Sequence, residues 1–554
     1  MEKKEQVRLV VALVLSFIVI FGWQYLTAPS SQEQAEMARK AADAEKKAAA
    51  LTEQAPAADV QSETAPAPEF IPTAGVPVTV DTPLYTATFN SQGGILEKFV
   101  LKNYRETIKE DSPFVDLIGA NAFAKGPLGL ILTQNGKEFH TWKRGQWAFD
   151  GSDITLAATD ATKTLTFTGQ SGDFRIKRVL TFHSDSYLIE EAATVTNLTA
   201  TGVEGALSFT AAAKSMSAED DRYNPTMVVY LTNDAREEMT DRDDLKEKGV
   251  SAAGGLKWGS IESNYFLFAV LPSEEDTSLS AGVQDDIFRM AVTEESTFMP
   301  NVAKTLKASY FIGSTDREML AKMPNDLDEA VNFGWFDFLA KPLLIGLNFF
   351  YDFVGNYGVA IIILTIIIKL IFWPLSQKSY SSMEQMKKLQ PMIQKLREKY
   401  GDDKQRLNQE TMALYKTYKV NPMGGCLPML VQIPVFFGLY KALLGAVELR
   451  QAAFISHVPF TDLPWLADLS AKDPYYVTPI IMGASMFLQQ KMTPSAGDPT
   501  QQKIMLFMPL IFTFMFLNFP SGLVIYWLFN NLLSIGQQLM IARASKVKAA
   551  ASND

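Results

Sequence analysis

The feature that most constrains this chain is a set of long apolar segments in its last two hundred residues, one of which carries a lone charge. Residues 359–373 read as a membrane-spanning helix, and Lys369 is the only charged residue in that run. A bare ammonium in hydrocarbon costs roughly 2.5–3.5 kcal/mol, so such a group usually faces a partner or water. We therefore hypothesise a wet, positively charged pocket within the membrane. The alternative is that Lys369, close to Pro374 and Lys378, extends to the membrane surface.

The amino terminus carries a further apolar stretch, Leu9–Leu26, preceded by basic residues at 3, 4 and 8. A cleaved signal peptide has a similar pattern. This stretch is longer than the apolar part of a signal peptide, and Leu26 and Pro29 flank the best cleavage point, after Ala28, unfavourably. We predict an uncleaved signal-anchor helix over residues 1–27 with a cytoplasmic amino terminus.

A change of composition separates this anchor from the next part of the chain. Residues 28–75 are rich in Ala, Glu and Pro and are predicted to be a flexible linker. From 76 to 325, short apolar stretches alternate with Gly-, Asp- and Asn-rich turns, which predicts one large β-sandwich domain. The expected strands include Leu84–Phe89, Thr164–Thr168, Ile176–Phe182, Met227–Leu231, Tyr265–Leu271 and Leu306–Ile312, with turns at Ser91–Gly94 and Gly169–Asp173.

The rest of the chain is predicted to be helical. Residues 326–352 should form an amphipathic helix on the outer membrane surface. Residues 353–542 hold five further apolar segments, which with the anchor make six spans and place both termini on one side. These segments are Phe353–Leu375, Leu427–Val447, Tyr476–Phe487, Ile504–Phe519 and Leu523–Met540.

Basic residues mark the cytoplasmic side of this topology. The segment 376–421 and the tail 543–554 are basic, so the β domain should face the periplasm. Apolar residues recur at helical spacing on both sides of Gly401–Asp403, which predicts a cytosolic helical hairpin whose first arm Pro391 should kink. Its charges are either an ordinary solvated surface or a site for anionic headgroups or an acidic partner.

Several function classes lack support in the sequence. The net charge of −10 argues against sequence-specific nucleic-acid binding, and no nucleotide-binding or hydrolase motif is found, so an ATP-driven pump is disfavoured. The single cysteine, Cys426, excludes an intrachain disulfide. His140 and His183 lack neighbours at metal-ligand spacing. We expect no cofactor, no metal and no catalysed reaction.

Several sequence motifs closely resemble the YidC family of bacterial membrane protein insertases. They are Lys404–Glu410, Asn421–Pro428, Asp473–Tyr476, Gln501–Met505 and Phe519–Tyr526. The resemblance is dense from about 335 to 545 and looser in the β domain, which is similar to the periplasmic domain of the Gram-negative members. It implies a six-helix polytopic bundle with a cytosolic hairpin, plus an all-β supersandwich related to sugar mutarotases.

The resemblance also implies a hydrophilic groove open to the cytosol and the lipid. By motif position its positive residue is Lys369, where the family commonly has Arg. Thr365, Lys369 and Trp373 are spaced i, i+4 and i+8, so they should share one helix face. Tyr526 and Trp527 are the family's aromatic pair on the last helix, and Gln432 is a further groove candidate. On the hairpin we single out Lys387, Lys388, Lys395, Arg397, Asp402, Asp403, Lys404 and Arg406.

The partners implied are nascent membrane proteins, the Sec translocon (SecYEG and SecDF), the ribosome, signal-recognition components and membrane lipids. The location implied is the bacterial inner membrane. Two other function classes stay open at this point. One is a secondary transporter with Lys369 in its site, which should show paired inverted repeats. The other is a membrane-anchored, mutarotase-like sugar-binding protein, which needs a His and a carboxylate converging within 76–325.

Overall fold

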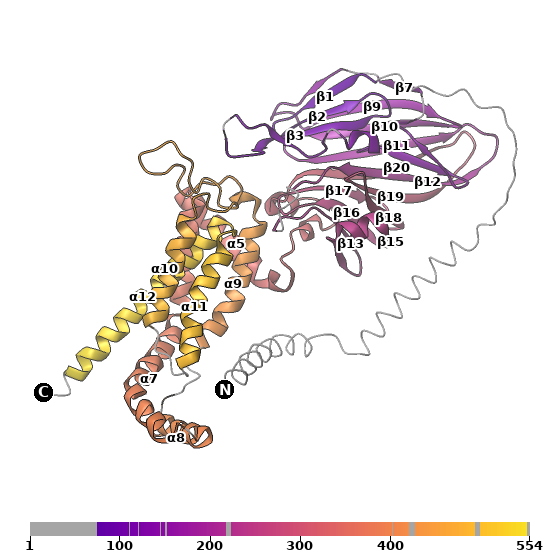
Figure 1. Cartoon of the computed structure of the whole chain (residues 1–554). Coiled ribbons are helices and arrows are strands. Elements are labelled where there is room, and N and C mark those ends of the chain that lie inside the picture. Colours follow the sequence, from indigo (N-terminus) through magenta and orange to yellow (C-terminus); the bar gives the residue numbers. More distant parts are fainter. Residues whose placement is uncertain are drawn as a thin grey trace. The chain divides into compact units, whose positions relative to one another are not determined.

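The computed structural model describes residues 75–550, with gaps at 110, 120, 144–145, 150–151, 218–222, 402, 419, 421–426 and 493–498. The chain divides into two compact units, Met1–Glu69 and Phe70–Asp554. The first unit lies outside the described residues, so the expected signal anchor and almost all of the expected linker do too. The second unit consists of strands followed by helices (Figure 1), which confirms the predicted order.

Within the described residues the strands form three sheets, of five, nine and six strands. The first sheet has the order β4 (Phe114–Asp116), β3 (Ile95–Arg105), β2 (Tyr85–Asn90), β1 (Pro77–Asp81) and β8 (Ile154–Thr155). The second has the order β14 (Arg236–Met239), β13 (Met227–Thr232), β16 (Leu256–Glu262), β17 (Phe266–Pro272), β20 (Ala303–Ser314), β11 (Leu188–Asn197), β10 (Phe174–His183), β9 (Thr162–Ser171) and β7 (Gln146–Phe149). The third has the order β15 (Val250–Ala253), β18 (Thr277–Gln284), β19 (Ile287–Phe298), β12 (Val203–Ala213), β5 (Leu130–Gln134) and β6 (Lys137–His140).

The nine- and six-stranded sheets pack face to face, as a sandwich requires. Contacts run from β16, β17 and β20 to β12, β18 and β19. Gly259 on β16 allows this approach, because a Cβ there would lie 2.1 Å from Cδ1 of Leu279. β10 buries every second residue, as expected for a strand with one covered face. The six expected strands are confirmed, but β9 extends through Ser171, which leaves the turn to Gly172 and Asp173.

Short helices lie within the β domain and between it and the helical part. They are η1 (Phe123–Lys125), α3 (Arg242–Glu247), α4 (Arg317–Leu320), η2 (Leu327–Ala330) and η3 (Gly334–Phe336). The expected surface helix is shorter than predicted, because α5 begins only at Asp337 and ends at Val354. Asp326 and Gly334 both have positive φ, 55° and 64°, which an α-helix cannot accommodate. Within α5, Phe338, Ile345, Phe349 and Phe353 are exposed, and Ala340, Leu344 and Leu347 are buried.

The remaining helices are α6 (Tyr357–Ile371), α7 (Trp373–Tyr400), α8 (Lys404–Thr417), α9 (Leu427–Gly445), η5 (Val447–Leu449), α10 (Val477–Met492), α11 (Pro499–Phe516) and α12 (Ser521–Ala550). α12 packs on α6 and α10, α5 packs on α6 and α9, and α11 packs on α10. α12 continues to Ala550 and so includes most of the tail predicted as a separate segment. None of the described helices is by itself both long enough and apolar enough to cross a membrane. The bent pair of α6 and α7 together has the required length and hydropathy.

Side chains connect the β domain to the loops of the helical part. Arg450 Nη2 and Gln451 Nε2 donate to the carbonyl of Arg105, at 2.7 and 2.6 Å. The Arg450 guanidinium also lies 5.2 Å from the ring centre of Phe266. Asn264 Nδ2 donates to the carbonyl of Leu444 at 3.4 Å. The tips of β3 and β17 are therefore joined to the end of α9 and to the segment that follows it.

Candidate functional site

Lys369 lies near the end of α6, on the face that packs against α12. Asn356 caps the start of α6, because its side chain accepts a hydrogen bond from the Val359 N–H at 3.1 Å. Thr365 and Lys369 are one turn apart and both are buried, at 1% and 9% exposure. The helix ends at Ile371, and the axis turns by 66° into α7.

Trp373 does not share the face of Thr365 and Lys369, contrary to the prediction. It is the first residue of α7, beyond the bend, and its Nε1 donates to Gln377 Oε1 at 2.9 Å. Pro374 accounts for the break, because proline has no N–H to donate to the Leu370 carbonyl and its ring crowds that carbonyl.

The ammonium of Lys369 is held by two neutral side chains of α12. Nζ donates to Ser534 Oγ at 2.6 Å and to Asn530 Oδ1 at 3.5 Å. The Ser534 hydroxyl in turn donates to the Asn530 carbonyl at 2.7 Å, which leaves its oxygen free to accept from Nζ. The second contact is at the distance limit for a hydrogen bond. The charge is therefore solvated by dipoles and not neutralised by either partner.

Gln432 and Tyr526 form a second polar contact nearer the start of α12. Gln432 Nε2 donates to the Tyr526 hydroxyl at 2.5 Å. The Trp527 indole packs perpendicular to the Phe436 ring, with centroids 4.7 Å apart. Its buried Nε1 has no acceptor within the described part of the chain. The Thr365 hydroxyl bonds the Ile361 carbonyl of its own helix at 2.6 Å, so it is already satisfied.

One stripe of α12 joins these contacts. Tyr526, Asn530, Ser534 and Gln537 follow one another at steps of four, four and three, which places them on one helix face. Gln537 Nε2 donates to the Trp373 carbonyl at 3.4 Å. We use the name polar seam for Lys369, Gln432 and these four residues of α12.

Sequence analysis missed Asn530, Ser534 and Gln537. Their spacing with Tyr526 was visible in the sequence, and polar residues at helical spacing in an apolar segment are an available signal. The sequence alone does not show which face of α12 packs against α6.

The predicted helical hairpin forms, with its own small core. Met383, Met386, Leu389 and Ile393 of α7 pack with Tyr415 and Val420. Asp403 caps α8, accepting from the Arg406 N–H at 3.0 Å. α7 continues through Pro391.

The selected charges of the hairpin are mostly on its surface. Lys387, Lys388, Lys395 and Arg406 are exposed, and Arg397 is half-buried. Asp402 lies outside the described residues, as does the side chain of Lys404. These charges do not approach the polar seam through any contact found in the described chain.

The described residues contain no group of three His, Cys, Asp or Glu side chains suited to a metal. Cys426 lies outside them. His140 is 3.2 Å from Glu138 and His183 is 3.3 Å from Glu190, each through Nε2. The site thus offers one cation, amides, hydroxyls and an indole, which can bind and orient a polar chain.

Two family models together match most of the chain. The model described as "60Kd inner membrane protein" matches residues 349–549, and that described as "YidC periplasmic domain" matches residues 77–345. The Membrane protein insertase YidC of Maridesulfovibrio salexigens is 52% identical over 539 residues, covering 97% of this chain and 99% of the relative. The chain belongs to the YidC family.

Other YidC relatives agree. The Membrane protein insertase YidC of Oleidesulfovibrio alaskensis is 50% identical, covering 98% of this chain and 100% of the relative. As a YidC protein the chain is a membrane protein insertase of the inner membrane, and its expected classification as a non-enzyme agrees with these relatives. This sets aside the transporter and the sugar-binding protein as functions.

Two solved structures are similar to parts of the chain. An active YidC insertase crystal structure has 19% identity and a TM-score of 0.35, covering 84% of this chain and 94% of that one. A galactose mutarotase-like protein from Lactobacillus casei has 12% identity and a TM-score of 0.32, covering 43% of this chain and 100% of that one. Membership of the YidC family rests on the sequence matches alone.

Proposed function

We propose that the polar seam receives the polar segment of a nascent membrane protein during insertion. The observation that carries this proposal is the environment of Lys369: a buried cation whose two hydrogen-bond partners are both neutral. Ser534 and Asn530 supply no negative charge, so a client carboxylate that reached Nζ would provide Lys369 with a counter-ion. In these buried surroundings the attraction between two opposite charges is stronger than in water. Acidic client tails should therefore benefit most.

The free energy for insertion comes from the client and the membrane. Partition of an apolar client segment contributes about 0.8 kcal/mol per buried CH₂. The membrane potential adds roughly 2.3 kcal/mol per charge per 100 mV for export of a negative tail. These contributions are enough for a short tail without ATP.

We propose that the apolar segment leaves between α9 and α11. α9 packs mainly on α5 and α11 on α10, so their own packing does not lock the two helices together. Aromatic side chains connect them through α12: Phe436 of α9 and Phe512 and Phe516 of α11 all contact the Trp527 ring. Rings of this kind can separate and re-form contacts without leaving a hydrogen bond unpaired.

The orientation follows from the charge pattern of the sequence. We propose six spans, with α6 and α9–α12 following the amino-terminal anchor and both termini in the cytoplasm. The supersandwich would then be periplasmic, and the exposed apolar face of α5 would lie in the outer membrane surface. The exposed basic residues of the hairpin, next to the membrane, suit lipid headgroups, the ribosome and signal-recognition components; work beside SecYEG and SecDF is part of the same proposal.

Photocrosslinking tests the proposed entry site. A photoreactive amino acid is placed at 365, 432 or 527, and a ribosome-bound client with an acidic tail is irradiated during insertion. We expect the client to crosslink at all three positions, and not at position 366, whose residue is 38% exposed on another face of α6. Equal crosslinking at 366 and at the three probed positions in and beside the seam would reject the seam as the entry site.

A further inference from the structure

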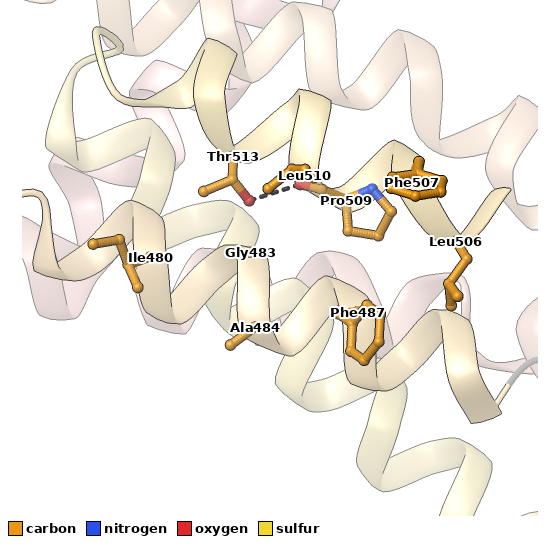
Figure 2. Close-up of a pocket in the computed structure, with 9 residues that line it drawn as sticks. All are labelled: Ile480, Gly483, Ala484, Phe487, Leu506, Phe507, Pro509, Leu510 and Thr513. Carbon is orange, nitrogen blue, oxygen red and sulfur yellow. Dashed lines mark hydrogen bonds between the residues drawn. The ribbon is translucent and has the colours of Figure 1, made fainter. Parts of the chain in front are cut away.

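An apolar groove lies between α10 and α11, and the polar seam does not include it. Figure 2 shows its lining: Ile480, Gly483, Ala484 and Phe487 from α10, and Leu506, Phe507, Pro509, Leu510 and Thr513 from α11. Its volume is about 470 Å³. Ile480, Phe507 and Leu510 are 58–67% exposed, so the groove is open along one side.

Two residues give the groove its shape. A Cβ on Gly483 would lie 1.9 Å from Thr513 Oγ1, so only glycine lets the helices approach this closely. The Thr513 hydroxyl is already bonded to the Pro509 carbonyl at 2.6 Å (Figure 2). The groove therefore has no side-chain donor waiting for a polar ligand, and it suits a hydrocarbon one.

The width of the groove selects between hydrocarbon ligands. A helix is about 10 Å across. α10 and α11 touch at Gly483 and Thr513, so a client helix cannot enter between them. A single acyl chain is only one methylene wide and would fit.

A cation lies at one end of the same helix face. Ile480, Ala484, Phe487 and Lys491 are spaced by four, three and four residues, so Lys491 follows Phe487 on the groove side of α10. Lys491 is in the last turn of α10 and is exposed. The ammonium of Lys491 thus lies one turn beyond the apolar groove, at the level of the lipid headgroups. There it can attract the negative headgroup of an anionic lipid whose acyl chain lies in the groove.

We propose that this groove binds one acyl chain of an anionic phospholipid, with the net negative headgroup at Lys491. The proposal rests on the membrane location that membership of the YidC family shows, and not on the polar seam. The lipid belongs to the leaflet at the carboxyl end of α10. Bound there, the acyl chain lies along the open side of the groove, beside the contact between Gly483 and Thr513.

The test uses the full-length protein in phosphatidylcholine vesicles that contain phosphatidylglycerol with a photoreactive diazirine in its acyl chain. After irradiation, labelled peptides are identified by mass spectrometry. We expect labelling within 480–491 and 506–513. Ala484→Phe should lower labelling about tenfold. The added ring would exclude at least two methylenes of the acyl chain, and their loss weakens binding by about that factor. Lys491→Gln should lower labelling by phosphatidylglycerol about fivefold and leave labelling by a matching phosphatidylcholine probe unchanged.

The controls separate the groove from ordinary lipid contact. Ile481→Phe adds the same ring to an exposed position outside the lining and should leave labelling unchanged. Leu510→Trp fills the groove from the side of α11. It replaces Ala484→Phe in the test if that variant does not fold. A Lys369→Glu variant should still be labelled even where insertion fails, which distinguishes this proposal from the seam. Equal labelling of the wild type, Ala484→Phe and Leu510→Trp would mean bulk lipid only and would overturn the proposal.

Discussion

At the scale of single residues, the central fact is a buried ammonium held by Ser534 and Asn530. Hydrogen bonds from neutral groups lower the cost of burying the cation but leave its charge in place. The folded protein can therefore bury the charged form of Lys369, and the uncompensated charge still attracts an anion. This combination allows function to depend on the sign of the charge at position 369.

Substitutions of Lys369 test that dependence. Lys369→Arg should retain insertion, Lys369→Ala should be intermediate, and Lys369→Glu should fail for clients with acidic tails. At 4 Å and an effective dielectric of 20, one charge pair is worth about 4 kcal/mol, so reversing the sign should reduce insertion tenfold or more. The assay compares one client with an acidic or a neutralised tail, normalised to the amount of insertase in the membrane.

The neutralised client is the internal control, because it should respond little to any of the three substitutions. If Lys369 merely extended to the membrane surface, Lys369→Glu would be harmless to insertion. Equal insertion of both clients by the Glu variant would exclude charge attraction and leave the insertase assignment intact.

Glu262 gives the β domain a pH dependence of its own. Burial raises the pKa of its carboxyl to about 7, although Arg236 at 3.2 Å and the Ser260 hydroxyl at 2.5 Å act in the opposite direction. The unfolded carboxyl titrates near 4.5. Between these values the folded domain keeps a proton that the unfolded chain releases, so the free energy of unfolding should fall by roughly 3 kcal/mol as the pH rises from 4.5 to 7.

Thermal unfolding of the full-length protein in detergent, at pH 5 and pH 7, measures this effect through the β-sheet circular dichroism signal. Glu262→Gln should flatten the difference, because the amide does not titrate. Glu190→Gln removes an exposed carboxylate from the same sheet and serves as the matched control. The same decline in Glu262→Gln as in the wild type would assign the pH dependence to other groups.

Residues with a strong local signature were predictable. Lys369 stands out because charge is costly in an apolar run, and Asp403 because it follows a turn and precedes a helix. Ser534 and Asn530 were not singled out, since small polar residues are common in membrane helices. The contact between Gln432 and Tyr526 joins residues that are 94 positions apart, and no local pattern encodes it.

At the scale of elements, the hairpin of α7 and α8 is a separate small unit. Its core of Met383, Met386, Leu389, Ile393, Tyr415 and Val420 is distinct from the main core of the chain. The spacing of the α7 residues in the sequence predicted this core. The break between α6 and α7 was not predicted, because the apolar pattern continues across it.

Removal of this unit tests its role. Replacement of about 383–418 by a short Gly-Ser linker should abolish insertion and leave the β domain folded, because the hairpin core is independent. Insertion of a standard client in depleted cells is the readout, and protease resistance of the β domain checks the fold. Full complementation by the deletion would exclude the hairpin from the mechanism.

A surface variant refines the result. Lys387→Gln, Lys388→Gln and Lys395→Gln together should keep the hairpin core, since all three side chains are exposed. Partial loss of insertion in this variant would assign the role to the basic surface, whereas full activity would assign it to the fold of the hairpin.

At the scale of the whole molecule, polar contacts between described residues join the sheets to the helices. The tips of β3 and β17 meet Arg450, Gln451 and the Leu444 carbonyl. The sequence predicted the two kinds of structure and their order, because hydropathy and periodicity change sharply near residue 326. It could not predict the sheet order, in which β11 pairs with β20, or these junction contacts, because both depend on residues distant in the sequence.

Large deletions within about 80–310 should be tolerated for insertion if α5 is kept. All residues of the polar seam follow position 343, and none lies in the β domain. Loss of the Arg450 and Gln451 contacts should lower the melting temperature of the helical part by a few degrees without abolishing activity. Insertion by the deletion variant, normalised to its membrane level, is the measurement. A folded, membrane-inserted variant that inserts no client would extend the essential unit into the sheets.

The bend between α6 and α7 has a mechanical consequence. A single residue, Phe372, separates the helix that carries Lys369 from the helix that forms the first arm of the hairpin. Because the link is so short, a rotation of α7 is passed on to α6. Gln537 also connects Trp373, the first residue of α7, to α12. We therefore expect a force on the hairpin to act both on α6, which carries Lys369, and on α12, which carries Ser534.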